Sequence, residues 1–319
     1  MPVSPGGKVR RLTALIVILA CTCIGVPGGA RADGLRVVVS VKPIHSLVAG
    51  VMLGVGELAL LVKGASSPHD YALKPSDALL LEQADLVFWV GKSFEASLAK
   101  PLGVLAEDDR SIALGGADGL VLLPPRQGGL WEASENGQAD DDPMNSVFDG
   151  HVWLDPLNAK AMVVAVVAAL SERDPAHSEI YRTNGAALEL RLNQLDSELS
   201  AELALVKDVP FIVFHDAFQY FERRYGLASI GAITVGPGQM PGAGRLQQIR
   251  KSIAEQGVRC VFREPNFEPT LVQAVTADSD ARIGVLDPEG VVITAGPDLY
   301  FELMRGNAAS VEKCLAGSG

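Results

Sequence analysis

The sequence is poor in the residues that usually mark a metal or redox site. Its 319 residues include only four cysteines and five histidines. It has no C-x-x-C and no H-E-x-x-H motif, so short-range spacing indicates neither a thiol redox centre nor a zinc protease. Any metal site must therefore be assembled from residues that are distant in the sequence.

Basic side chains are also scarce. The chain has 27 Lys and Arg against 38 Asp and Glu, a formal charge of -11. Nucleic acid is excluded as a partner on this ground, because phosphate neutralisation needs a basic surface. The remaining composition, 48% hydrophobic and 20% charged, is typical of a folded globular protein.

A long apolar run occurs only near the N-terminus. Leu12–Val26 is apolar over about 15 residues, which is short for a bilayer span. Ala30-Arg31-Ala32 fits a cleavage site, so residues 1–32 are predicted to be a signal peptide of a periplasmic protein. The alternatives are an uncleaved anchor and lipidation at Cys21. The basic residues before the run are Lys8, Arg10 and Arg11.

Export changes both the charge and the cysteine count. Without residues 1–32 the chain keeps 23 basic and 38 acidic side chains, a formal charge of −15, whose field favours the approach of cations. Cys260 and Cys314 are then the only cysteines left. In an oxidising compartment we expect them to form a disulfide, the alternative being two free buried thiols.

Two passages alternate short apolar strands with helical patterns. This order predicts an α/β protein with two lobes, each a mainly parallel sheet flanked by helices. In the first passage, strands are expected at 35–41, 57–62 and 86–90, and helices at 43–53, 75–84 and 94–106. In the second, strands are expected at 211–214, 229–235, 258–262 and 282–286, and helices at 217–225, 244–257 and 268–277.

Two longer helical patterns, 157–172 and 175–206, separate these passages. The first is apolar all round and is expected to be buried, joining the lobes as a rigid connection. In the second, leucines recur at helical spacing at positions 188, 192, 195 and 199. The predicted organisation is an N-terminal lobe at 33–155, linking helices at 156–206 and a C-terminal lobe at 207–319.

An acidic stretch at about 127–150 is predicted to be a loop. It holds six carboxylates and no Lys or Arg, and four glycines and Pro143 break any periodic pattern. Such a segment is most simply a solvated linker. The alternative is a weak second site for metal cations, although carboxylates alone favour harder cations than zinc.

Three of the five histidines lie at the ends of expected elements. His69 follows the second strand, His151 ends the acidic stretch, and His215 follows the strand F-I-V-F directly. Asp287 likewise follows the strand at 282–286. Ligands of open α/β sheets bind beyond the carboxyl ends of the strands, which makes these residues candidates for a site. From spacing alone, a structural role for each histidine remains the simpler interpretation.

Several segments together resemble one known family, the metal-binding solute-binding proteins of ABC importers, and within it the zinc-specific ZnuA type. The resemblance covers nearly the whole chain after residue 32, in order. The segments are P-H-D-Y-A-L-K-P-S-D at 68–77, H-V-W-L-D-P at 151–156, V-F-H-D-A-F-Q-Y-F at 213–221, P-G-A-G-R-L at 241–246, C-V-F-R-E-P at 260–265 and L-D-P-E-G at 286–290.

The resemblance implies one high-affinity Zn²⁺ site in a cleft between two lobes joined by a long helix. It implies His69 and His151 as ligands from the N-terminal lobe and His215 from the C-terminal lobe, with Asp287 as a ligand or close neighbour. Manganese-binding relatives usually carry Glu where this chain has His215, so this residue argues for zinc. The family also implies delivery to a membrane permease, and the expected state is a monomer.

The chain departs from the family pattern in two places. Many zinc-specific relatives have a histidine-rich loop before the second ligand, whereas no histidine occurs here between His69 and His151. Pro68 stands where some relatives have an acidic residue. The resemblance also supports pairing of Cys260 with Cys314, since zinc-type relatives form a disulfide at the matching positions.

Two other classes of function remain open from the sequence. Three histidines with an open position are also typical of a catalytic zinc site, although no general base occurs at a recognised spacing. A surface adhesin would need acylation at Cys21. We expect a carrier and not an enzyme. His45 and His177 are interpreted as structural or exposed, and Trp153 and Phe214 as core residues.

Overall fold

The structure, a computed structural model, describes residues 34–64, 67–69, 71–106, 109–131, 148–234 and 241–317. The expected signal peptide at 1–32 and the alternative lipidation at Cys21 lie outside this part of the chain. Residues 132–147, with five of the six carboxylates of the acidic stretch, lie outside it as well. Expectations about these segments stay predictions.

Short apolar runs form a first sheet, in which all neighbouring strands are parallel and follow the order β2-β1-β3-β4. Three of its strands were expected from the sequence. The fourth was missed, because Ser-Ile-Ala is too short to show a strand pattern. The strands are β1 (Arg36–Val39), β2 (Glu57–Leu60), β3 (Leu86–Trp89) and β4 (Ser111–Ala113).

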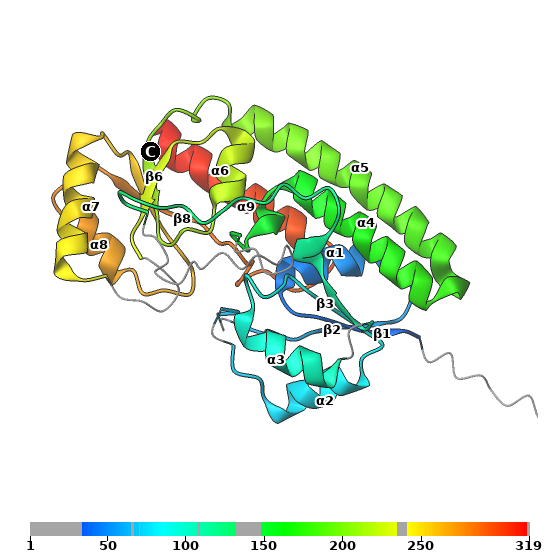
Figure 1. Cartoon of the computed structure of the whole chain (residues 1–319). Helices are drawn as coiled ribbons and strands as arrows, with labels where there is room; N and C mark the ends of the chain where they lie inside the picture. The colour runs from blue at the N-terminus through cyan, green and yellow to red at the C-terminus, as the bar shows by residue number, and fades with distance from the viewer. Residues whose placement is uncertain are drawn as a thin grey trace, which may run out of the picture. The chain divides into compact units, whose positions relative to one another are not determined.

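Helices connect these strands, as parallel pairing requires. Pro75 opens the second helix, and Asp77 accepts a hydrogen bond of 2.9 Å from the backbone N–H of Lys74, which confirms the expected helix start. The helices are α1 (Lys42–Val51), α2 (Pro75–Gln83) and α3 (Ala96–Leu105). Figure 1 shows α2 and α3 close together beside this sheet.

A second parallel sheet has the order β6-β5-β7-β8. Alternate residues of β5 pack on opposite faces: Phe211 and Val213 join the main core, and Ile212 joins a separate cluster beneath α7 and α8. The strands are β5 (Phe211–Val213), β6 (Ser229–Ala232), β7 (Cys260–Arg263) and β8 (Arg282–Val285). The helices of this part are α6 (Gln219–Tyr225), α7 (Ala243–Glu255) and α8 (Thr270–Thr276).

Two long helices, α4 (Pro156–Arg173) and α5 (Ser178–Leu203), run side by side between the two sheets in sequence (Figure 1). The leucines that recur at helical spacing in α5 are buried. The expectation that α4 is buried all round was wrong, because Val164 on its outer face is 53% exposed. Isolated apolar residues on a surface are ordinary, so composition alone did not reveal which face packs inward.

The sequence patterns did not predict the C-terminal helix, α9 (Leu299–Ala316). It packs against both α1 and α5. Near its start, the backbone N–H of Tyr300 donates to Ser46 Oγ at 3.0 Å, and the Tyr300 hydroxyl donates to the carbonyl of Trp153 at 2.7 Å. One apolar core therefore extends from the first sheet through these helices to the second sheet. No described helix is both long and apolar enough to span a membrane.

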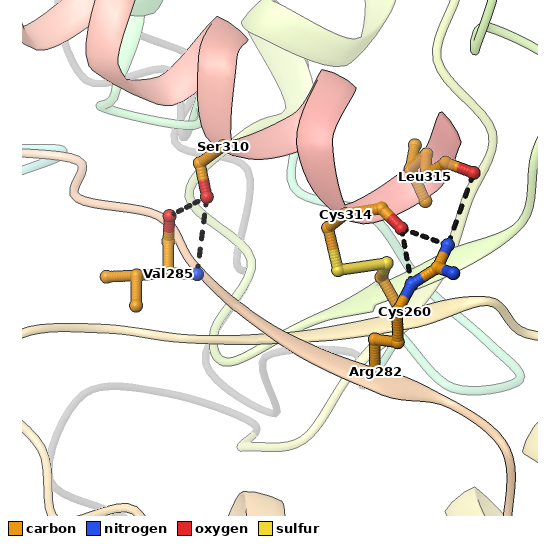
Figure 2. The surroundings of a disulfide bond; sticks show 6 residues. All are labelled: Cys260, Arg282, Val285, Ser310, Cys314 and Leu315. Atoms are coloured by element: carbon orange, nitrogen blue, oxygen red, sulfur yellow. Dashed lines mark hydrogen bonds between the residues drawn. A yellow bond between two sulfur atoms is a disulfide. The ribbon is translucent and has the colours of Figure 1, made fainter. Parts of the chain in front are cut away.

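Cys260 at the start of β7 and Cys314 near the end of α9 form a disulfide, as expected (Figure 2). Beside it, Arg282 Nε of β8 donates to the carbonyl of Cys314 at 2.8 Å and so binds a free carbonyl of the last helical turn. Ser310 Oγ donates to the carbonyl of Val285 at 2.6 Å. The end of α9 is thus fixed to two strands of the second sheet.

Replacing both Cys260 and Cys314 with serine should lower the free energy of unfolding by about 2–5 kcal/mol, because the open chain gains conformational freedom in the unfolded state. Urea denaturation of the oxidised protein and the double variant measures the difference. Dithiothreitol should bring the wild type to the midpoint of the variant and leave the variant unchanged. Equal midpoints for the oxidised wild type and the variant would contradict the prediction.

Candidate metal centre

The three expected histidine ligands meet in one place. His69, His151 and His215 each contribute a ring nitrogen to a group in which all three atoms lie within 4.8 Å of one another. The Nε2 atoms of His151 and His215 are 3.4 Å apart. His151 and His215 are only 5% and 7% exposed. These three distant residues therefore lie together, as the resemblance implies, and their role as metal ligands stays a prediction.

Strand ends and one tight turn bring these side chains together. His69 lies in the loop after β2, and His215 follows the last residue of β5 by two positions. His151 immediately precedes a one-turn 3-10 helix, η3 (Val152–Leu154), that leads into α4. Gly150 allows this turn to approach the first lobe, because a Cβ atom there would lie 2.5 Å from Cβ of Phe94.

Each imidazole is held through its Nδ1 atom, which forms a hydrogen bond to an acceptor of the protein. His151 Nδ1 lies 2.8 Å from Asp149 Oδ1, and His215 Nδ1 lies 2.5 Å from Glu264 Oε1. His69 bonds to the backbone of Phe94, while its buried Nε2 atom has no hydrogen-bond partner. These contacts orient the rings, and the Nε2 atoms of His151 and His215 face each other at 3.4 Å. Together with the unpartnered Nε2 of His69, this convergent set of ring nitrogens fits a cation.

The three imidazoles differ in their affinity for protons. Burial lowers the pKa of His69 to about 2, with a further contribution from the two other histidines. Burial likewise lowers the pKa of His151 well below its ordinary value. Burial also acts on His215, but the charge of Glu264 and its hydrogen bond outweigh it and raise the pKa. Of the three rings, His215 is therefore the one that most readily takes up a proton.

Aromatic rings form an apolar wall beside the histidines. The Phe94 ring lies 4.5 Å from His69 and 5.1 Å from His151, between ring centroids. Trp153 is fully buried and lies 5.5 Å from the His151 ring. Phe214 instead stacks on Phe267 in the second cluster of the C-terminal lobe. Excluding water on one side strengthens metal binding and holds the rings in place.

Asp287, the fourth residue expected from the resemblance, is not part of this group. Its carboxylate instead holds its own turn together. Oδ1 accepts the backbone N–H of Glu289 at 3.0 Å and of Gly290 at 2.8 Å, and Oδ2 accepts that of Val291 at 2.7 Å. Asn307 of α9 pairs with the backbone of Asp287. These bonds direct both oxygens into the turn.

Sequence reasoning missed the residues that orient the rings. Asp149 was counted only among the loop carboxylates, although its position two residues before His151 lets it accept both the backbone N–H and Nδ1 of that histidine. Glu264 directly follows β7, at the same sheet edge as His215. Phe94 lies in the loop after β3, five residues beyond its end. For Glu264 the available signal was a polar residue just after a buried parallel strand.

The other candidates lie outside the group. His45 is buried on α1, and burial lowers its pKa to about 4. His177 lies at the junction of α4 and α5, where its Nδ1 is 2.6 Å from Asp174 Oδ2. Asp70, next to His69, is outside the described residues.

A protein-family model described as zinc-uptake complex component A, periplasmic, matches residues 37–314. The chain belongs to the ZnuA family. The high-affinity zinc uptake system protein ZnuA of Brucella suis is 45% identical over 315 residues, which cover 90% of this chain and 94% of that protein. The protein of the same name from Paracoccus denitrificans is 34% identical, covering 96% and 98%.

Solved structures agree with the fold. A crystal structure of ZnuA has a TM-score of 0.74 and 25% identity, covering 89% of this chain and all of the other. The laminin-binding protein of Streptococcus agalactiae has a TM-score of 0.72, 24% identity and coverage of 88% and 100%, a likeness that extends to the fold alone. The two-lobed α/β fold expected from the family resemblance is confirmed.

Glu264→Gln should change how zinc binding depends on pH. In the wild type, affinity should be full above the raised pKa of His215 and should fall as the pH drops through it, because protonated imidazole cannot bind metal. Removing the charge of Glu264 lowers that pKa, so the fall should begin at lower pH. Affinity at about pH 8 should decrease by about 10- to 100-fold, since a neutral amide oxygen accepts from Nδ1 more weakly than a carboxylate and leaves the ring a poorer donor.

Chelator competition titrations between about pH 5 and 8, a range that spans the ordinary histidine pKa, measure both effects. Glu268→Gln, which removes an exposed charge of the same lobe, is the control and should match the wild type. An unchanged pH midpoint in Glu264→Gln would show that another group sets the proton competition.

Proposed function

We propose that this chain captures Zn²⁺ outside the cytoplasm in one high-affinity site and delivers it to the permease of an ABC importer. His69, His151 and His215 bind the ion through their Nε2 atoms. The observation that carries the proposal is the convergence of three buried ring nitrogens whose partner nitrogens already have acceptors. Membership of the ZnuA family supports zinc as the cargo.

The donor chemistry favours zinc over manganese. Imidazole nitrogen is a ligand of intermediate softness that suits Zn²⁺, whereas Mn²⁺ prefers oxygen donors. His151 and His69 are held neutral by burial, so two of the three donors need no deprotonation at neutral pH. A site prepared in this way binds a four-coordinate cation with little loss to proton competition.

The proposal includes export and the way the protein works outside the membrane. Residues 1–32 act as a cleavable signal peptide, and the mature chain works in the periplasm as a monomer. Its formal charge of −15 attracts cations and opposes binding to nucleic acid. The permease is the macromolecular partner, as for other carriers of this family.

Binding without catalysis also agrees with how the nearby carboxylates are used. In a zinc hydrolase, a carboxylate near the metal is free to activate water. Here Asp149 and Glu264 bond to the imidazoles, and Asp287 bonds to backbone N–H groups. We therefore favour a carrier over an enzyme.

Replacing His215 with alanine should weaken zinc binding by about 100-fold or more, because it removes one of three nitrogen donors and leaves the Glu264 carboxylate buried without its partner. His177→Ala, at the exposed junction of α4 and α5, should leave affinity unchanged. Competition titration with a fluorescent chelator compares the two variants. Equal losses from both would contradict the ligand assignment.

The acidic stretch is proposed to hold, at most, a weaker second site. Replacing residues 132–147 with a short Gly-Ser linker should therefore leave tight zinc binding intact. Any second, weaker zinc-binding event that calorimetry detects in the wild type should disappear. The deletion should spare Leu130, which is buried against Gly231 and whose carbonyl accepts from Arg245 at 2.7 Å. Loss of the tight site would show that a ligand lies within the deleted residues.

A further inference from the structure

The chain that follows β4 crosses to the second sheet. Residues 121–131, here called the crossing segment, start on α4, where the Asn158 side chain accepts the N–H of Val121 at 2.8 Å and donates to its carbonyl at 3.1 Å. They end beside β6, where the carbonyl of Leu130 accepts the N–H of Ala232 at 3.2 Å (Figure 1). The crossing segment therefore connects the two lobes in addition to the long helices.

Arg126, in the middle of the crossing segment, joins two acids of the C-terminal lobe. Its Nε donates to both carboxylate oxygens of Asp216 at 2.9 and 3.0 Å, and its Nη2 donates to Oδ1 as well. Its Nη1 donates to Oε2 of Glu222 on α6 at 2.5 Å. The guanidinium lies 3.4 Å above the centre of the Trp131 ring. The Arg126 side chain is only 18% exposed, and charge-assisted bidentate contacts shielded in this way are strong.

These contacts hold the loop that carries His215. Asp216 is the next residue in the chain, and α6 begins three positions later, at Gln219. Gln219 also contacts the crossing segment, because its Nε2 donates to the carbonyl of Pro124 at 3.2 Å. Since His215 and Asp216 share a peptide bond, fixing the Asp216 side chain limits how far the backbone of His215 can move.

The crossing segment also holds the turn that carries His151. The carbonyl of Leu123 accepts the N–H of Asp149 at 2.8 Å, and the N–H of Leu123 donates to the hydroxyl of Tyr220 at 3.1 Å. The same hydroxyl donates to the carbonyl of Asp149 at 2.8 Å, and Asp149 in turn accepts from His151. A continuous chain of contacts therefore joins the loops of two histidines that come from different lobes.

The charges around Arg126 explain why this position needs a cation. Burial opposes the charge of the guanidinium, but Glu222 and Asp216 outweigh it and raise the pKa of Arg126, so the side chain stays charged. Without it, a buried carboxylate and a neighbouring one would repel each other and have no cationic partner. The loop after β5 should then shift to bring both carboxylates into water.

We propose that Arg126 is a positioning residue for the zinc site, which acts through Asp216 to keep His215 at binding distance from the histidines of the N-terminal lobe. Arg126 does not touch the ion. The proposal rests on the three-histidine ligand set proposed above. If the loop moves, only a fraction of the molecules present all three donors together, and the apparent affinity falls by that fraction.

The test compares Arg126→Met, Asp216→Asn and the double variant. Each single change should weaken zinc binding about tenfold, as measured by competition with a fluorescent chelator. Release of zinc into excess chelator, followed by stopped flow, should accelerate by a similar factor, because such differences appear mainly in the dissociation rate. The double variant should lie within about twofold of the weaker single variant, since the two residues act as one pair.

Two controls accompany these variants. Arg305→Met breaks a similar arginine–carboxylate pair, with Glu198 at 2.9 and 2.8 Å, that lies exposed between α9 and α5, and it should match the wild type. Asp216→Asn leaves Arg126 paired with Glu222, so an effect of this variant on zinc release cannot be ascribed to an unpaired buried acid.

Wild-type affinity and release in either single variant, or losses that multiply in the double variant, would overturn the proposal. A purely structural contribution of each residue predicts such multiplication. His215→Ala tests the ligand set separately. If it abolishes tight binding while Arg126→Met binds like the wild type, the ligand set stands and only the role of Arg126 is rejected. If His215→Ala itself binds zinc like the wild type, the proposed function fails.

Discussion

The structure centres on three imidazole rings whose nitrogens converge inside the protein. Burying ring nitrogens away from water costs free energy unless they find partners, and Nε2 of His69 has none. The surrounding protein nevertheless holds each ring by its other nitrogen, through Asp149, Glu264 and the backbone of Phe94. The fold thus stabilises a geometry that a bound metal ion completes.

The two carboxylate–imidazole pairs look alike but have different electrostatic consequences. Burial raises the pKa of Asp149 to about 7, so this acid carries less charge to share with His151. Glu264, in contrast, raises the pKa of His215. One pair mainly fixes a ring orientation, whereas the other also makes its ring more basic and hence a stronger donor. The N-terminal lobe supplies the neutral rings and the C-terminal lobe supplies the basic one.

Much of the fold could be predicted from the sequence because strand and helix periodicities differ clearly. The alternation of short valine-rich runs with helical patterns predicted seven of the eight strands that the described residues form, and the two lobes. Strand β4 could not be predicted, because three residues show no periodic pattern. The buried face of α4 could not be predicted either, because an alanine- and valine-rich helix shows no polar face.

The candidate ligand residues could be named from the family resemblance, but their supporting contacts could not. His69, His151 and His215 belong to recognisable segments, whereas the role of Glu264 depends on two strands, β5 and β7, being neighbours. Asp287 shows most clearly which contacts the sequence could not predict. Its position after β8 was right for a ligand, and only the hydrogen bonds of its carboxylate show that it closes a turn.

Helix α9 has a mechanical consequence. It leaves the C-terminal lobe, packs on α1 near Ser46, and is tied back to β7 by Cys314. Beside α5, it forms a second helical connection between the two lobes, about 27 Å long for 18 residues. Two such helices resist bending far better than one, because any rotation of one lobe against the other must shear both at once. A frame braced by two helices opposes a large swing of the lobes, so we expect metal exchange to depend mainly on movements of the loops around the three histidines.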